Sequence, residues 1–382
     1  EILAISKRNA TKIAKNLMEA KNPRIHVGRL RTHEGINKAI ELVEITGSSV
    51  RTSATSGPLS FPERHPLCGE GYNQDYDYIL GLESDGKNTS IQGPTLLSRA
   101  DKRDLSNIGF GFIRKPVIPP RRDLSGENDL TADAEASIPI IIEEYKRILK
   151  ADNISDTAEK IRLDTSANIR KHEKDLKQTL NKKRKGWDSS PVSLGRLYAE
   201  LWPLIKDLDW CLSSPTVFSS RHHVGMWEHN KPYSYLGMHG AGGIGYCIGA
   251  SAGAGLAAKT RNRIVINIQC DGDLNYTPGS LWTAAHHNLP LLTIMHNNRG
   301  YHQEVMYLQY MAGVRGRGTD RMHIGTTLRE PFIDYAKLAE AYGMNNEGPI
   351  DNPNELSAAY KRGINSVLSG EPYLIDVITE PR

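Results

Sequence analysis

The sequence has no apolar run of the ~18 residues that a membrane-spanning helix needs. Residues 1–22 also lack the apolar core of a secretory signal peptide. The four cysteines, Cys68, Cys211, Cys247 and Cys270, are scattered without the spacing of a metal site or a disulfide framework. The net charge is only +4 over 382 residues and comes largely from local basic clusters, so nucleic acid is not an expected partner. We therefore expect a cytoplasmic protein with free thiols and no membrane partner.

What the sequence does contain is enough apolar material for two domains, since 38% of its 382 residues are hydrophobic. Short β-branched runs alternate with segments of helical composition in both halves of the chain. This alternation predicts an α/β protein with two doubly wound parallel-sheet domains. We expect a Rossmann-like domain over residues 1–150, a charged connector over 151–189 and a second domain over 190–382.

The individual elements are predicted from hydrophobic periodicity and from capping residues. Expected strands cover residues 24–28, 50–53, 78–82, 210–213, 263–269, 291–295 and 373–378. Expected helices cover 33–46 (capped by Thr32), 137–149 (capped by Ser137), 193–202 (stopped by Pro203), 279–287, 333–342 and 356–368. Residues 302–331 have little periodicity and are interpreted as a loop, whose arginines could pair with a substrate carboxylate or phosphate.

Polar residues follow two of these strands, which a crossover helix connects. Asp271 follows the strand at 263–269, and Asn298 follows the strand at 291–295. Parallel strands put their carboxyl ends at one edge of a sheet, and Mg²⁺ prefers oxygen ligands. We therefore predict a metal site formed by Asp271, Asn298 and the carbonyl group of Gly300. The alternative is an ordinary strand–helix–strand unit in which Asp271 caps a turn and Asn298 is a loop residue.

Two stretches resemble the cofactor signatures of thiamine diphosphate enzymes. From Asp271 to Tyr301 the chain has an Asp-Gly turn, a long spacer and an Asn-Asn-x-Gly-Tyr sequence; Cys270 departs from the family, which has glycine there. Gly242-Gly243-Ile244-Gly245 resembles the family's Gly-x-hydrophobic-Gly turn, in which Ile244 would force the cofactor into a bent shape. The resemblance implies that the protein binds thiamine diphosphate with Mg²⁺. The implied cofactor-binding residues are Gly242, Gly243, Ile244, Gly272, Asp273, Asn275 and Tyr301.

The resemblance extends over nearly the whole chain and is to the acetolactate synthase-like group, including the Pro-Glu-Arg-His-Pro-Leu run at residues 62–67. It implies that 1–150 is a central domain bracing a homodimer or homotetramer and that 190–382 binds the diphosphate. FAD or another nucleotide in the central domain has no support from a glycine fingerprint. The family's activating glutamate lies on a pyrimidine-binding domain, expected upstream in the same polypeptide or in a partner subunit. Glu34 is instead expected to be a solvated residue in the first turn of a helix.

The implied activity is that of a lyase or transferase, a decarboxylase/carboligase acting on a small-molecule 2-oxo acid. His222 and His223, in the loop before the glycine turn, are candidate catalytic acid–base groups, although histidines without a role fit that loop equally well. Other interpretations stay open: a 2-hydroxyacyl-CoA lyase or oxalyl-CoA decarboxylase acting on an acyl-CoA, a non-catalytic cofactor-binding or scaffold subunit, or a nucleotide-binding structural protein.

Overall fold

The computed structural model describes residues 4–52, 61–68, 76–83, 95–97, 129–151, 167, 173–178, 180–213, 226–237 and 243–381. The chain divides into two compact units: unit 1 comprises residues 1–176 and 229–233, and unit 2 comprises 177–228 and 234–382. Each unit contains a five-stranded sheet whose paired strands are all parallel, so the predicted α/β class with two parallel-sheet domains is confirmed. No described helix has the length and apolar composition needed to cross a bilayer. All four cysteines lie in the described part of the chain, and none of them forms a disulfide there.

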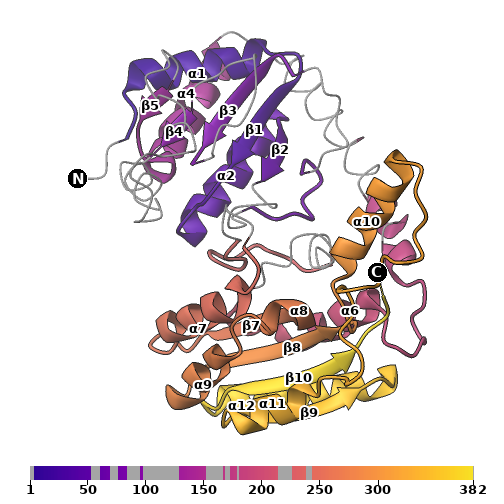
Figure 1. Cartoon of the computed structure of the whole chain (residues 1–382). Coiled ribbons are helices and arrows are strands. Elements are labelled where there is room, and N and C mark those ends of the chain that lie inside the picture. Colours follow the sequence, from indigo (N-terminus) through magenta and orange to yellow (C-terminus); the bar gives the residue numbers. More distant parts are fainter. Residues whose placement is uncertain are drawn as a thin grey trace, which may run out of the picture. The chain divides into compact units, whose positions relative to one another are not determined.

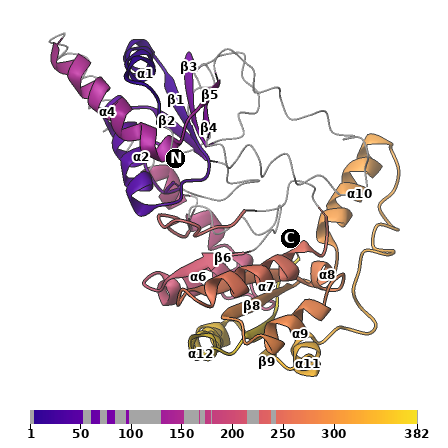
Figure 2. The same cartoon turned by 90° about the vertical axis from the view of Figure 1, so that its left-hand side faces the viewer.

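The sheet of unit 1 has three helices on one face. Its strand order is β2-β1-β3-β4-β5, with β1 at Pro23–Val27, β2 at Ser49–Thr52, β3 at Tyr78–Leu82, β4 at Thr95–Leu97 and β5 at Asp129–Thr131. The helices are α1 (Lys7–Glu19), α2 (His33–Thr46) and α4 (Ala134–Ala151), and α4 contacts both of the others. The three helices therefore lie side by side along the sheet (Figures 1 and 2).

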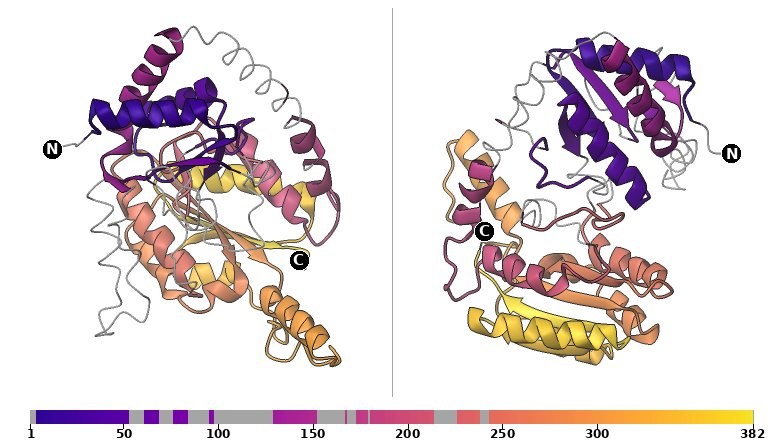
Figure 3. Two further views of the ribbon diagram at one scale, coloured as in Figure 1. Left: turned by 90° about the horizontal axis from the view of Figure 1, so that it is seen from above. Right: turned by 180° about the vertical axis from the view of Figure 1, so that it is seen from behind.

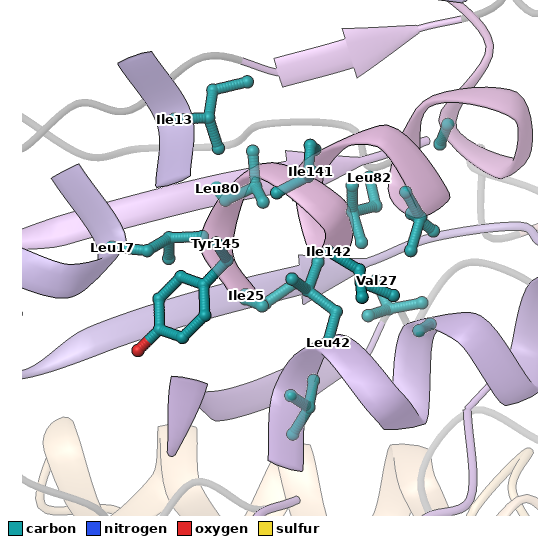
Figure 4. Close-up of a cluster of buried hydrophobic side chains, with 14 of the residues drawn as sticks. Ile13, Leu17, Ile25, Val27, Leu42, Leu80, Leu82, Ile141, Ile142 and Tyr145 are labelled. Atoms are coloured by element: carbon teal, nitrogen blue, oxygen red, sulfur yellow. The ribbon is translucent and has the colours of Figure 1, made fainter. Parts of the chain in front are cut away.

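The core of unit 1 fills the space between this sheet and its helices. The strands contribute side chains at every second position, and the helices contribute them at intervals of three or four residues, so each element presents one apolar face. Figure 4 shows these side chains converging. They include Ile13 and Leu17 of α1, Ile25 and Val27 of β1, Leu42 of α2, Leu80 and Leu82 of β3, and Ile141, Ile142 and Tyr145 of α4.

Helix capping in unit 1 agrees with the prediction at α2 and differs at α4. The Thr32 hydroxyl accepts a hydrogen bond of 2.9 Å from the Gly35 amide, and Glu34 is exposed in the first turn of α2. The predicted cap of α4 at Ser137 is wrong. The Asp133 carboxylate accepts from the Ala136 amide at 3.0 Å, so α4 begins at Ala134. The Ser137 hydroxyl instead donates to the Asp133 carbonyl group, one turn back within the helix.

Unit 2 has helices on both faces of its sheet. The strand order is β6-β7-β8-β10-β9, with β6 at Trp210–Leu212, β7 at Ile264–Cys270, β8 at Leu291–Asn297, β9 at Asn345–Ile350 and β10 at Tyr373–Ile378. Helices α7 (Tyr246–Ala258), α9 (Gly279–His286) and α11 (Tyr335–Ala341) share one buried cluster with the sheet. Helices α6 (Leu194–Ile205) and α12 (Leu356–Leu368) contact each other and lie in front of the sheet when it is seen from behind (Figure 3).

Two predictions about unit 2 are wrong. Helix α6 does not stop at Pro203 but continues to Ile205, although a proline inside a helix removes the N–H that would donate to the carbonyl group four residues earlier. Residues His302–Val314 form helix α10 and not a loop. The periodicity that would have predicted α10 is absent because Val305 is the buried residue of this helix, while Tyr307, Tyr310 and Val314 are exposed.

Candidate active site

The candidate site lies where β7 and β8 end, in the middle of the unit 2 sheet. The two strands are parallel neighbours, and Cys270 of β7 is paired with His296 of β8. Asp271 is therefore the first residue after β7, at the start of the four-residue helix α8 (Asp271–Leu274), and Asn298 is the first residue after β8. The predicted strands at 263–269 and 291–295 thus bring the two polar residues to one edge of the sheet, as expected from their order.

Asp271 is a buried carboxylate with 2% of its surface exposed. Its Oδ1 atom accepts a hydrogen bond of 2.8 Å from the Gly272 amide, and its Oδ2 atom accepts one of 3.0 Å from the Gly300 amide. Burial nevertheless raises the pKa of Asp271 to about 6, because the low dielectric penalises the charged form more than the backbone amides favour it. A cation beside this carboxylate would offset the cost of its burial.

Asn298 carries a buried oxygen without a donor. The residue is 8% exposed, and its Oδ1 atom has no hydrogen-bond partner among the described residues. Its Nδ2 atom lies 3.4 Å from Nε2 of the buried His296, whose Nδ1 is 2.6 Å from the Thr379 hydroxyl. A buried polar atom normally has a partner, and an unpaired one indicates a function, often an unseen ion or water. The side-chain oxygen of Asn298 is thus available to a cation.

Gly300 lies in the same loop as Asn298, and its backbone amide contacts Asp271. It forms an isolated antiparallel bridge with Thr327, made by hydrogen bonds of the flanking residues, Tyr301 to Thr326 and Leu328 to Arg299. In a pair of this kind the N–H and C=O groups of the central residue both point away from the partner strand. The Gly300 amide points to Asp271, so its carbonyl oxygen is on the same side. A Cβ atom on Gly300 would lie 2.8 Å from the Thr326 carbonyl oxygen, so the position requires glycine.

These donors fit a hard divalent cation. One carboxylate, one amide oxygen and one carbonyl oxygen are the ligands that Mg²⁺ accepts while it keeps other positions for water or phosphate oxygens. Among the described residues no group of three or more His, Cys, Asp or Glu side chains could hold a metal ion. The site therefore differs from a thiolate or histidine centre, and its two buried, electron-rich oxygens on Asp271 and Asn298 are the feature that a cation would satisfy.

The predicted cofactor residues near α8 lie close to this site. A Cβ atom on Gly272 would come within 2.4 Å of the Tyr301 ring, and the Tyr301 hydroxyl donates to the Gly272 carbonyl group at 3.4 Å. Asn275 follows α8, and its side-chain oxygen accepts a hydrogen bond of 3.2 Å from the Tyr335 hydroxyl. Asp273 points to the glycine turn, where its Oδ1 atom accepts from the Gly245 amide at 2.6 Å.

The glycine turn thus meets the α8 segment in unit 2. Gly243 and Ile244 precede α7, and the Ile244 side chain is 47% exposed. Of the residues predicted for the site, Gly242, His222 and His223 lie outside the described residues.

Sequence reasoning missed two supporting residues. Tyr335 is fully buried, and its hydroxyl also donates to the Asp271 carbonyl group at 3.1 Å. Its backbone amide donates to Oδ2 of Asp376 at 3.2 Å, and Oδ1 of Asp376 accepts from Asn297 at 3.0 Å. Burial raises the pKa of Asp376 to about 6. The sequence predicted a helix over residues 333–342, but the contact of Tyr335 with Asp271 joins residues 64 positions apart.

Comparison with known proteins agrees with this geometry. The C-terminal TPP-binding domain of thiamine pyrophosphate enzymes matches residues 218–377. The probable acetolactate synthase large subunit of Methanocaldococcus jannaschii is 27% identical over 200 residues, which cover 51% of this chain and 32% of that protein. Benzoylformate decarboxylase of Pseudomonas aeruginosa is 31% identical over 153 residues, which cover 40% of this chain and 26% of that protein. The chain thus spans less than a third of either relative.

Solved structures share the fold. The thiamine diphosphate-dependent 4-hydroxybenzoylformate decarboxylase of Rhodococcus jostii superimposes with a TM-score of 0.65 and 20% identity, covering 100% of this chain and 66% of that one. Benzoylformate decarboxylase of Polynucleobacter necessarius gives a TM-score of 0.62 and 16% identity, covering 99% of this chain and 65% of that one. Residues 218–377 thus match the TPP-binding domain of thiamine pyrophosphate enzymes, and the chain is similar to acetolactate synthase and benzoylformate decarboxylase within the segments given above.

Proposed function

We propose that this chain is part of a thiamine diphosphate- and Mg²⁺-dependent decarboxylase/carboligase that acts on a 2-oxo acid. The proposal is carried by two groups at the ends of adjacent strands: the buried Asp271 carboxylate, and the side-chain oxygen of Asn298, which has no partner among the described residues. Both residues lie in the segment that matches a TPP-binding domain. A protein that needed no cation there would leave both groups buried at a cost.

Each part of the site has a role in this proposal. Asp271, Asn298 and the Gly300 carbonyl group would hold the Mg²⁺ ion, which would keep diphosphate oxygens as further ligands. The backbone around Gly272, with Asn275 and Tyr301, would face the diphosphate. Ile244 and the glycines before it would support the rings, as the resemblance implies.

The division of chemistry follows from these roles. Thiamine diphosphate, when bound, supplies the electron sink for loss of CO₂ from a 2-oxo acid. The chain would hold the Mg²⁺ ion that neutralises the diphosphate, and it would supply a fixed orientation and a site shielded from water. His222 and His223 would move protons at the substrate end, and the activating glutamate would come from a pyrimidine-binding segment or a partner subunit. A cytoplasmic homodimer or homotetramer is part of the proposal.

The test is CO₂ release from pyruvate and benzoylformate by the purified protein, with any partner polypeptide that copurifies, in the presence of thiamine diphosphate and Mg²⁺. The proposal predicts release from at least one of these acids and its loss in an Asp271→Ala variant. Formyl-CoA production from oxalyl-CoA, or cleavage of a 2-hydroxyacyl-CoA, without activity on either acid would reassign the substrate to the acyl-CoA class. Cofactor binding without turnover of any of these compounds would favour a non-catalytic subunit.

A further inference from the structure

Two hydrogen bonds join the glycine turn to the α8 segment, one at the backbone amide of Gly245 and one at its carbonyl group. The Gly245 amide donates a hydrogen bond of 2.6 Å to Oδ1 of Asp273, and the Gly245 carbonyl group accepts one of 2.6 Å from the Thr277 hydroxyl. We call Asp273, Thr277 and Gly245 the Gly245 clamp. Gly245 belongs to one cofactor signature, and Asp273 and Thr277, which lie 28 and 32 residues later in the sequence, belong to the other.

The backbone conformation of Gly245 and its close neighbours leave no space for a side chain at this position. Its φ angle is +89°, a backbone conformation in which a Cβ atom is strained, and that Cβ atom would lie 2.6 Å from Cβ of Tyr276. Ile244 is the residue immediately before this fixed glycine, and its side chain is 47% exposed. The position of Ile244 is therefore set from one side by the clamp.

Asp273 is itself held by a residue of β7, a strand inside the unit 2 sheet. Its Oδ2 atom accepts a hydrogen bond of 2.8 Å from Nε2 of Gln269, which is fully buried in β7. The Asn267 side chain donates to Oε1 of Gln269 at 3.0 Å and so fixes the orientation of the Gln269 amide group. Both carboxylate oxygens of Asp273 are therefore engaged by donors within the protein, and the chain of contacts begins in a rigid, buried strand.

The charge of Asp273 decides between two roles. A carboxylate directed at an anionic diphosphate would repel it, whereas one that accepts from Gly245 and Gln269 has its charge compensated by two N–H donors. We propose that Asp273 is a positioning residue: with Thr277 it holds the turn that carries Ile244 and thereby sets the binding of the cofactor's rings, and it does not bind the diphosphate. This inference rests on the proposed function, because it assumes that the site takes thiamine diphosphate.

The test compares two ligands, thiamine diphosphate and inorganic diphosphate, each titrated with Mg²⁺ into the wild type, Asp273→Ala and Asp273→Asn. Removal of a positioning residue should weaken binding of thiamine diphosphate at least ~10-fold, as for other residues that orient ligand-binding groups. Binding of inorganic diphosphate, which has no rings, should be as strong as in the wild type or stronger. Asp273→Asn keeps an oxygen for the Gly245 amide but loses the acceptor for Gln269, so it should recover part of the affinity for thiamine diphosphate.

A second pair of variants covers the case in which Asp273→Ala fails to fold, as judged by circular dichroism. Thr277→Val removes the hydroxyl donor at nearly constant volume, and Thr277→Ser keeps it. The inference predicts selective loss of affinity for thiamine diphosphate in Thr277→Val and normal affinity in Thr277→Ser. Equal weakening of both ligands in the Asp273 and Thr277→Val variants would overturn it. A wild type that binds neither ligand would instead refute the proposed function itself.

Discussion

The backbone amide of Gly300 donates a hydrogen bond of 3.0 Å to the carboxylate of Asp271, which lies 29 positions earlier in the chain. This contact fixes the loop after β8 against the loop after β7. The loop after β8 also carries the Asn298 side-chain oxygen, which is buried and has no hydrogen-bond partner among the described residues. The two loops that carry the proposed cation ligands are therefore held together by a hydrogen bond within the chain itself.

Two adjacent asparagines should respond differently to the same substitution. Asn298→Leu removes the unpartnered oxygen, so Mg²⁺-dependent binding of thiamine diphosphate should weaken by ~10–100-fold. The free energy of unfolding without metal should fall by no more than about 1 kcal/mol, because Oδ1 has no partner among the described residues and the Nδ2 contact with His296 is long, at 3.4 Å. Calorimetric titration and urea denaturation measure the two quantities.

Asn297→Leu is the matched control. The Asn297 side chain donates to the buried Asp376 carboxylate, so its loss leaves a buried acceptor short of a donor. Here the free energy of unfolding should fall by about 1–3 kcal/mol. If Asn298→Leu proved the more destabilising of the two and bound the cofactor normally, Asn298 would have a structural role and the metal site would be wrongly assigned.

Gly272 and Gly279 offer a second matched pair. A Cβ atom on Gly272 would meet the Tyr301 ring at 2.4 Å, whereas one on Gly279 would have no neighbour within 4 Å. Gly272→Ala should therefore displace Tyr301, lower the free energy of unfolding by about 1–3 kcal/mol and weaken cofactor binding. Gly279→Ala should leave binding unchanged and stabilise the protein by up to about 1 kcal/mol, through a less flexible unfolded chain. Similar denaturation midpoints for the two variants would contradict the packing described at Gly272.

The raised pKa of Asp376 predicts that the free energy of unfolding depends on pH. Its pKa is raised by burial from 3.8 to about 6 in the folded protein, so the folded state binds the proton more tightly than the unfolded state does. Stability relative to Asp376→Asn should therefore be greatest at low pH and should fall as the pH rises from about 4 to about 6. One pKa unit corresponds to about 1.4 kcal/mol, so the total change should approach about 3 kcal/mol. The measurement is urea denaturation of both proteins across this pH range; a difference that does not vary with pH would contradict the raised pKa.

The sequence predicts the central part of unit 2 well for a physical reason. Strands β7, β8 and β10 are buried on both faces and read as largely apolar runs, and α12 has a clear apolar face. The edge strand β9 was not predicted, because Asn345, Asn346 and Glu347 are partly or fully exposed and the strand contains Gly348 and Pro349. An edge strand pairs on one side alone and needs few apolar residues.

The same reasoning applies to the site. Asp271 and Asn298 were predictable because their positions depend on the order of strands along the chain. The contacts of Tyr335 with Asp271 and Asp376, and of Asp273 with Gly245, were not predictable, because they depend on side chains that meet only once the sheet has formed. Asp273 was expected among the cofactor-binding residues, and its contacts with Gly245 and Gln269 are the basis for assigning it a positioning role.

The most direct test of the account is calorimetric titration of thiamine diphosphate into the wild type and Asp271→Ala, each with and without Mg²⁺. The account predicts binding by the wild type that requires Mg²⁺, and a loss of at least ~100-fold in Asp271→Ala, because the only carboxylate ligand of the proposed cation is removed. Circular dichroism would verify that the variant is folded. Binding that is independent of Mg²⁺, or equally tight in a folded Asp271→Ala protein, would contradict the metal site on which the account depends.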